Sequence, residues 1–290
     1  MTCVLGMIVR REREIRAFVK TPFYRVLAGC RLDGFPFDAE WKVNPQSRYQ
    51  GIPDLYKENG FKKKETAEEL IHYLRQEVQH ESEDMVMTIT AVEKKKESKN
   101  PPLLYNLAEA QNECSKMFKI SPDETLKIIQ ELYEKKLVTY PRTDARVLST
   151  AVAKEIGKNL NRLKTYEPTK TYTERILKEG TYRNIARTQY TDDSKITDHY
   201  AIIPTGQLTE LGSLSDLQRR VYDLVVRRFL SIFYPAAEYE TIKLVVQVEA
   251  EQFFASAKVL KNPGFLEIMG RPGNDENKEE ESAGLLKLAG

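Results

Sequence analysis

The chain has 290 residues, more than one compact domain usually holds, so we expect two units that share one path. Hydrophobic residues make up 41% of it, enough for real cores, while a formal net charge of +2 is too small to indicate nucleic-acid binding by itself. We find no signal peptide and no stretch apolar enough to cross a membrane. The three widely spaced cysteines form neither a disulfide framework nor a zinc pattern, which suits a reducing compartment, and we expect a cytoplasmic protein.

The first hundred residues predict one helix followed by a β-rich segment. Apolar spacing and turn residues predict, in chain order, a helix over residues 5–19, a hairpin over 23–41 that turns at Asp33-Gly34, an exposed irregular connection over 44–64, a helix that begins at Thr66 and reaches Val78, and a half-buried strand over 85–92. The charged run 93–99 and the sequence Asn100-Pro101-Pro102 then indicate a boundary between two units near residue 100.

The rest of the chain predicts mainly helices and a final hairpin. In chain order we expect a helix over 106–117, a helix opened by a Ser121/Glu124 capping box with Pro122 in its first turn, a helix capped by Ser149 or Thr150 and ending at Leu163, a flexible loop over 164–195, a helix opened by a Ser215/Gln218 capping box and ending at Phe233, and two strands over 239–250 and 253–260. On the helix that ends at Phe233, we expect Arg228 to lie outside the buried side.

Reactive side chains are concentrated in the segment Leu137–Asp144. Pro141 disfavours the α region for Tyr140, so the chain should be extended here, with Tyr140 and Arg142 pointing roughly the same way. Arginine can bind two phosphate oxygens, whereas a tyrosine, with a reference pKa of about 10, needs cationic neighbours or a proton acceptor to act as a nucleophile. Arg142 and the upstream Lys135 and Lys136 are candidates for those neighbours. The alternative is that Tyr140 is an ordinary core or surface residue at a helix exit.

A second signal is Asp198-His199-Tyr200-Ala201-Ile202-Ile203-Pro204-Thr205. A histidine beside an apolar run is often only a packing residue, and that reading stays open. Histidine can also change its charge near neutral pH, so His199 could act at a site if the fold brings it to Tyr140.

Both segments resemble signatures of one family. The run Leu132-Tyr133-Glu134-Lys135-Lys136-Leu137-Val138-Thr139-Tyr140-Pro141-Arg142-Thr143-Asp144 resembles the active-site signature of type IA DNA topoisomerases, and the proline after the tyrosine resembles the topoisomerase III branch. The segment from His199 to Thr205 resembles the same family's His-x-Ala-Ile-Ile-Pro-Thr run. The Thr-Pro-Thr-like run that precedes the first helix in those enzymes is replaced here by Thr2-Cys3-Val4.

The resemblance implies roles for individual residues. Tyr140 would be the nucleophile that becomes linked to a 5′ phosphate of single-stranded DNA, and Glu134 would lie close to the active site. Arg142 and His199 would contact the DNA backbone beside the reacting phosphate. The expected catalytic residues are thus Tyr140, Arg142, His199 and Glu134, and the expected DNA-binding residues are Arg142, Asp144, Arg146 and His199.

The resemblance also implies an α+β multidomain fold in which a mostly helical catalytic-tyrosine domain is inserted into a β-rich arch domain. The expected parts are a gate-base helix at 1–21, the first half of the arch at 22–103, the tyrosine domain at 104–205, the second half of the arch at 206–272 and a disordered tail at 273–290. The family's magnesium-binding carboxylates belong to an N-terminal domain that this chain lacks, so we expect no metal here and a fragment that is inactive by itself.

Two alternatives belong to other classes. The isolated chain could be a DNA-binding or hinge module without turnover, because half of the expected active site is missing. A tyrosine recombinase also forms phosphotyrosine links, but it needs arginines and histidines before a C-terminal tyrosine, whereas Tyr140 is mid-chain and His199 follows it.

Overall fold

The computed structural model describes residues 2–77 and 86–270. These residues form two compact units, which we call the sheet unit (residues 2–77, 86–95 and 241–259) and the helical unit (residues 96–240 and 260–270). Within residues 2–77 and 86–270 the chain passes between the units three times, in strands β3 (Thr88–Lys99), β4 (Ala237–Val248) and β5 (Glu251–Asn262). The fold is a mixture of helix and sheet, as the sequence predicted.

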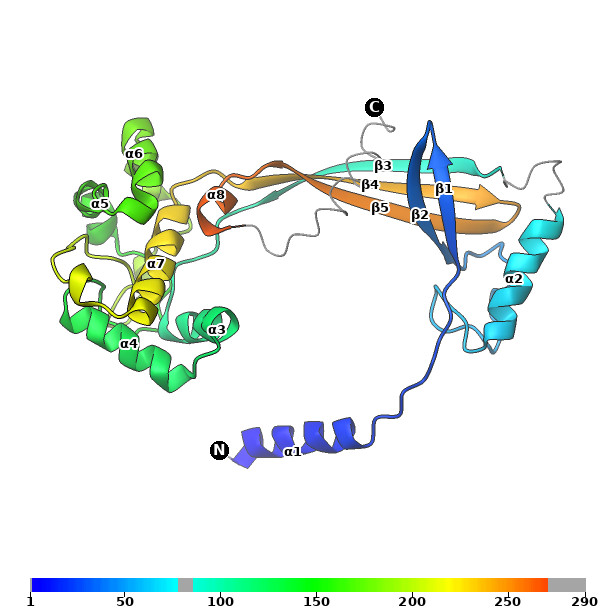
Figure 1. The fold of residues 1–290 in the computed structure, drawn as a ribbon, viewed down its shortest axis with the longest axis horizontal. Helices are drawn as coiled ribbons and strands as arrows, with labels where there is room; N and C mark the ends of the chain where they lie inside the picture. Colours follow the sequence, from blue (N-terminus) through cyan, green and yellow to red (C-terminus); the bar gives the residue numbers. More distant parts are fainter. Residues whose placement is uncertain (1, 78–85, 271–290) are drawn as a thin grey trace. The chain divides into compact units, whose positions relative to one another are not determined.

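One five-stranded sheet contains every β-strand of the described residues (Figure 1). Its order is β1-β2-β5-β4-β3, where β1 is Leu27–Leu32 and β2 is Phe35–Lys42. The β1–β2 hairpin turns at Asp33-Gly34, where both residues have positive φ, as its sequence predicted. β2 then pairs antiparallel with β5, with Trp41 opposite Phe253. β3 is longer than the expected strand, runs through the charged segment to Lys99, and is almost entirely exposed.

An aromatic cluster forms the core of the sheet unit. Trp41 stacks on Phe61 with ring centroids 4.8 Å apart, and Tyr49 meets both rings edge-on. The expectation that residues 44–64 are exposed was therefore wrong in part, because this irregular segment supplies two of the three rings. Glu251 is fully buried beside this cluster. It accepts hydrogen bonds from Trp41 Nε1 (2.8 Å) and, in the irregular segment, from Ser47 Oγ and the Arg48 N–H.

Two helices accompany the sheet unit. Helix α1 (Thr2–Arg16) has no buried residue. Helix α2 (Lys64–Glu77) buries Leu70 and Leu74, but it begins before Thr66, whose hydroxyl donates to Asp54 instead of capping the helix. The expected end of this helix at Val78, the start of a strand at Met85 and the tail at 273–290 lie outside the described residues.

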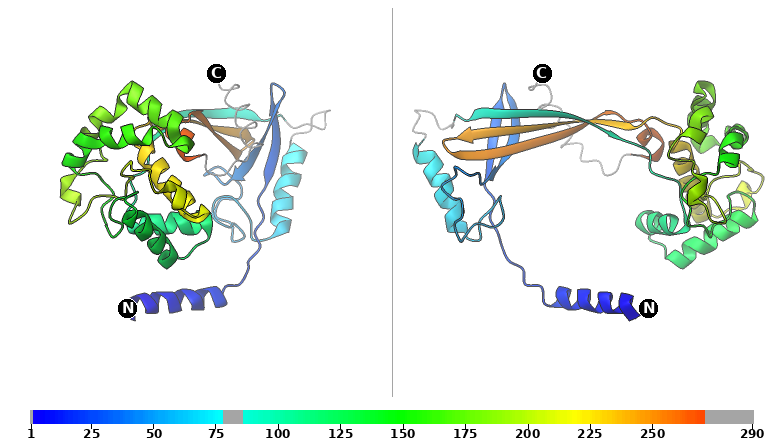
Figure 2. Two further views of the ribbon diagram at one scale, coloured as in Figure 1. Left: turned by 60° about the vertical axis from the view of Figure 1, so that its left-hand side comes forward. Right: turned by 180° about the vertical axis from the view of Figure 1, so that it is seen from behind.

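The helical unit is built from α3 (Leu107–Phe118), α4 (Pro122–Glu134), α5 (Thr150–Leu163), α6 (Lys170–Glu179), α7 (Asp216–Ser231) and the short α8 (Leu266–Met269). Side-chain caps begin four of them, with Asn106, Ser121, Ser149 and Ser215 each accepting an N–H from the first turn. Of these four caps only Ser215 with Gln218 is a complete capping box, so the expected Ser121/Glu124 box is present only as the Ser121 side-chain cap. Helix α7, yellow in Figure 2, contacts both α4 and α8.

The segment 164–195 is ordered into short helices, so the expectation of a flexible loop was wrong. It forms η1 (Glu167–Thr169), α6, η2 (Thr181–Arg187) and η3 (Asp193–Lys195). Its polar composition hid the anchors that it buries at intervals, namely Tyr166, Thr169, Thr173, Ile176, Ile185 and Tyr190. Two of the buried hydroxyls are also satisfied, since Thr173 Oγ1 donates to the Thr169 carbonyl and Tyr190 Oη donates to the Pro101 carbonyl at 2.7 Å.

Arg228 on α7 is buried, which corrects the expectation that it lies outside the buried side. Its guanidinium donates to the Leu103 carbonyl and to Tyr105 Oη, both at 3.0 Å, and lies 4.2 Å from the Tyr105 ring centroid. Burial raises the pKa of Tyr105 well above its usual range, so its phenol stays neutral. Helix α7 thereby packs into the same core as α4, although the sequence assigned 206–272 to the second half of the arch.

Among the helices of the described residues, none combines the length and apolar character that a membrane span requires.

The buried Glu251 gives a first testable prediction. Replacing Glu251 by Ala leaves the buried Trp41 indole N–H and the proton of the Ser47 hydroxyl without an acceptor, so the free energy of unfolding should fall by about 2–4 kcal/mol. Urea unfolding followed by Trp41 fluorescence measures the change. Glu238→Ala, an exposed change at the start of β4, is the control and should stay within about 0.5 kcal/mol. Equal effects of the two changes would contradict the network.

Candidate active site

A tight turn ends α4 and leads into the segment that contains Tyr140. The Lys136 N–H donates to the Tyr133 carbonyl (2.8 Å) and the Leu137 N–H to the Leu132 carbonyl (2.9 Å), which is the Schellman pattern of a helix C-terminus. Leu132 and Leu137 are fully buried, as this motif favours. Lys136 has φ 60°, a left-handed conformation that costs a residue with a Cβ about 1 kcal/mol and that glycine normally supplies.

Residues 137–139 pair with residues 203–205. The Thr139 N–H donates to the Ile203 carbonyl (2.9 Å), the Thr205 N–H donates to the Leu137 carbonyl (3.0 Å), and an antiparallel bridge joins Val138 to Pro204. This pairing is the reason why two sequence signals about sixty residues apart meet in space.

Threonine hydroxyls extend the pairing on both sides. Thr139 Oγ1 donates to the Ala201 carbonyl (3.0 Å) and accepts the Ile203 N–H (2.9 Å). Thr143 Oγ1 donates to the His199 carbonyl (2.7 Å), and Thr205 Oγ1 donates to the Lys136 carbonyl (2.6 Å). The backbone on either side of Tyr140 is therefore fixed to the backbone that follows His199.

The loop after Tyr140 is attached to the start of α3. The Leu107 N–H donates to the Thr143 carbonyl (3.2 Å), and Asn106 Nδ2 donates to the Asp144 carbonyl (3.1 Å). Arg146 reaches the Leu104 carbonyl through Nε (3.2 Å) and pairs with Glu109 at 3.3 Å. This arginine is thus engaged in holding the loop in place.

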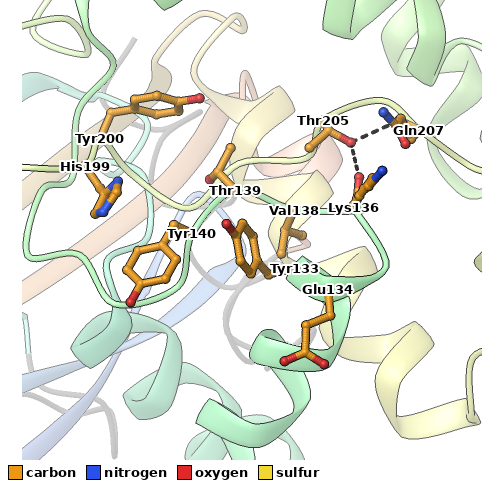
Figure 3. Close-up of a pocket in the computed structure, with 10 residues that line it drawn as sticks. All are labelled: Tyr133, Glu134, Lys136, Val138, Thr139, Tyr140, His199, Tyr200, Thr205 and Gln207. Carbon is orange, nitrogen blue, oxygen red and sulfur yellow. Dashed lines mark hydrogen bonds between the residues drawn. The ribbon is translucent and has the colours of Figure 1, made fainter.

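A pocket of about 520 Å³ lies beside this paired segment, and we call it the Tyr140 pocket (Figure 3). It is lined by Tyr133, Glu134, Lys136, Val138, Thr139, Tyr140, His199, Tyr200, Thr205 and Gln207. All of these residues belong to the helical unit, and they come from the end of α4, from the two paired segments and from the residues next to those segments.

Tyr140 lies between two other rings at the pocket. Its ring centroid is 4.4 Å from that of His199, with the planes tilted by 45°, and 5.4 Å from that of Tyr133, which meets it edge-on. Figure 3 shows the Tyr140 hydroxyl at the end of the ring that points away from His199. The contact between them is thus ring against ring, and it leaves the phenolic oxygen and the imidazole nitrogens available to a bound group.

The three tyrosines of the pocket are not equivalent. Burial raises the pKa of Tyr200, which makes its phenol harder to ionise and a weak candidate for a nucleophile. Tyr133 lies on the last turn of α4, and the residue is 38% exposed. Tyr140 is the tyrosine that follows the Schellman turn and contacts the histidine.

The predicted site residues fall into two groups. Tyr140, His199 and Glu134 line the pocket, and Glu134 accepts a hydrogen bond from Gln130 (3.1 Å). Arg142 and Asp144 are exposed and do not line it, and Arg146 holds the loop as described above. Within residues 2–77 and 86–270, the Arg142 side chain makes no hydrogen bond or ion pair, so it is free to contact a ligand outside the pocket.

Sequence reasoning did not single out six of the lining residues as site residues: Tyr133, Val138, Thr139, Tyr200, Thr205 and Gln207. Five of them belong to a quoted segment, and proximity in sequence was the available signal. Gln207 had none, because only the pairing of Thr205 with Leu137 brings it there.

No group of three or more histidine, cysteine, aspartate or glutamate side chains converges anywhere in the described part of the chain, so these residues do not fit a metal ion. Asp192 and Asp193 act as local caps instead. Asp192 accepts from Ser194, and Asp193 accepts from the N–H and the hydroxyl of Thr150. These hydrogen bonds, with Lys195 beside Asp192, lower the pKa of both carboxyls.

Comparison with known proteins gives a consistent result. Residues 1–289 match the family model described as DNA topoisomerase. The chain is 33% identical over 97% of its length to DNA topoisomerase 3 of Bacillus subtilis and 32% identical over 99% of its length to DNA topoisomerase 3 of Bacillus licheniformis. It covers 35% and 36% of those proteins, about a third of their length. The chain therefore belongs to the type IA DNA topoisomerase family.

A solved structure shares the fold. The full-length topoisomerase I of Thermotoga maritima superposes with a TM-score of 0.58 over 93% of this chain and 39% of that one, at 21% sequence identity. At that identity the match supports the architecture alone.

The Thr139 hydroxyl gives a second prediction. Thr139→Val keeps the shape of the side chain but removes both hydrogen bonds to the segment after His199, so the free energy of unfolding should fall by about 2 kcal/mol. Thermal unfolding measures the loss. Thr171→Val, on the exposed side of α6, is the matched control and should be nearly neutral. A Thr139 variant as stable as the control would show that the hydroxyl does not join the two segments.

Proposed function

We propose that this chain is the central part of a type IA DNA topoisomerase that cleaves and rejoins one DNA strand without ATP. The observation that carries the proposal is the contact between Tyr140 and His199 beside a pocket in a member of this family. The named relatives are DNA topoisomerases, so DNA is the proposed substrate, and the family resemblance is the reason why we propose its single-stranded form.

The reaction we propose is a transesterification. The Tyr140 oxygen attacks a backbone phosphorus, a bond from that oxygen to phosphorus forms, and the bond from phosphorus to the 3′ oxygen breaks. The phenolic proton is lost to solvent and the 3′ oxygen takes one up, so the 5′ phosphate stays on Tyr140. Rejoining is the reverse attack by the 3′ hydroxyl, and no energy source is needed because one ester replaces another.

The other residues act on the charge of the phosphate. We propose that His199 donates a hydrogen bond to an oxygen of the phosphate that Tyr140 attacks, because its ring lies against the phenol and its nitrogens have no hydrogen-bond partner among the described residues. Arg142, exposed two residues after Tyr140, would bind the backbone outside the pocket, where its fork can hold two phosphate oxygens.

Magnesium, which the family resemblance implies, would act through carboxylates other than those described here, since no suitable group converges in the described residues. The proposal routes no step through it. For strand passage we propose that the helical unit moves as a body on the strands that join it to the sheet unit, since the chain crosses between the units within β3, β4 and β5.

A second candidate function is a DNA-binding or hinge module without turnover. The observation that favours it is the same lack of a metal-binding group among the described residues. The two candidates differ in whether a covalent adduct can form, which an experiment can decide.

Labelled oligonucleotides test the proposal. The chain is mixed with single-stranded DNA and magnesium, alone and with the part of the Bacillus subtilis protein that this chain does not cover. Because the proposed link retains the 5′ phosphate, a label at the 3′ end should stay with the protein after denaturation and a label at the 5′ end should not. Tyr140→Phe should abolish the adduct, and Tyr200→Phe, in the same pocket, should leave a covalent adduct detectable.

Each result has one meaning. An adduct that retains the 5′-end label would contradict the proposed chemistry. DNA binding with no adduct in either mixture would favour the module without turnover.

A further inference from the structure

Lys136 occupies a backbone position at which glycine would be the default. It is the left-handed residue of the Schellman turn, with φ 60°, and every residue other than glycine is disfavoured there. Nothing in the turn itself requires a lysine, because the hydrogen bonds of the turn come from its backbone. The side chain therefore has no evident role in forming the turn.

The two lysines after α4 have different surroundings. The Lys135 ammonium donates to Ser213 Oγ at 2.9 Å and lies 3.9 Å from Glu210, so it holds η4 (Leu211–Ser213) against the end of α4. The Lys136 ammonium has no hydrogen bond or ion pair within residues 2–77 and 86–270. Lys136 lines the Tyr140 pocket and Lys135 does not.

Charge in the pocket makes this free ammonium significant. Glu134 and Lys136 are its only lining residues with a permanent charge at neutral pH, and His199 is the third ionisable group besides the tyrosines. Without Lys136 the permanent charge of the lining would be the Glu134 carboxylate alone, which repels a phosphate. An ammonium on a flexible four-carbon stem can neutralise that repulsion and follow a moving phosphate.

We propose that Lys136 binds a backbone phosphate of the strand that enters the Tyr140 pocket. The inference rests on the proposed function. It adds a phosphate-binding residue that precedes Tyr140 in the chain, whereas Arg142 follows it. One neutralised phosphate contributes about 0.7 to the slope of log affinity against log salt for single-stranded DNA.

The chain offers a matched control for this residue. Lys119 ends α3 with φ 59°, the same left-handed conformation at a helix C-terminus, and it is exposed. Its ammonium also makes no hydrogen bond or ion pair with the described residues, and it does not line the Tyr140 pocket. Replacing either lysine by glycine relieves the same backbone strain and removes one positive charge. The two variants therefore differ only in whether that charge was at the Tyr140 pocket.

The experiment measures binding of a fluorescent single-stranded oligonucleotide by anisotropy, without magnesium, between about 50 and 200 mM salt. Lys136→Gly should weaken binding about fivefold at about 0.1 M salt and reduce the magnitude of the salt slope by about 0.7. Lys136→Arg should bind like the parent chain. Lys119→Gly should keep the parental affinity and slope, and both glycine variants should melt no lower than the parent chain.

The outcomes separate the inference from the proposed function. If the parent chain does not bind the oligonucleotide, the proposed function fails and the inference fails with it. If the parent binds and Lys136→Gly matches Lys119→Gly in affinity and slope, the inference alone is wrong. Loss of binding in Lys136→Arg as well would show that the shape of the side chain matters and its charge does not, which also overturns the inference.

Discussion

The candidate site depends on the pairing of two short backbone segments, 137–139 and 203–205. Neither segment is a long strand, and their hydrogen bonds are made in a fully buried setting around Ile203 and Leu137. Buried backbone groups must find partners, so this pairing is costly to break. Because the pairing register is fixed, Tyr140 and His199 lie on adjacent stretches of chain with their rings 4.4 Å apart.

The surrounding helices stabilise that pairing from outside. The Schellman turn directs the chain out of α4, and the α3 N-terminus holds the loop that follows Tyr140. Buried Arg228 ties α7 to the segment just before α3, through the Leu103 carbonyl and the Tyr105 hydroxyl. A buried guanidinium is tolerated only with such partners, so the position of α7 is specified by polar contacts as well as by apolar packing.

Local signals predicted much of the fold and part of the site. Helix caps are local chemistry between neighbouring residues, and the structure has the predicted cap at Ser121 and chooses Ser149 over Thr150 at the next helix. The buried carboxylate of Glu251 and the guanidinium of Arg228 were beyond sequence reasoning, because each is hydrogen-bonded to groups more than a hundred residues away. Sequence reasoning could name Lys136 only as a nearby cation. Its place in the pocket depends on a left-handed backbone conformation, and a lysine gives no signal for that conformation because glycine usually adopts it.

The most direct test of the account is whether Tyr140 and His199 are neighbours in solution through this backbone pairing. Nuclear Overhauser effects between their ring protons, together with exchange of the Ile203 amide hydrogen, measure both at once. The account predicts ring-to-ring effects between the two residues and an Ile203 amide that exchanges as slowly as those in the middle of α7. No ring-to-ring effect together with fast exchange at Ile203 would contradict it.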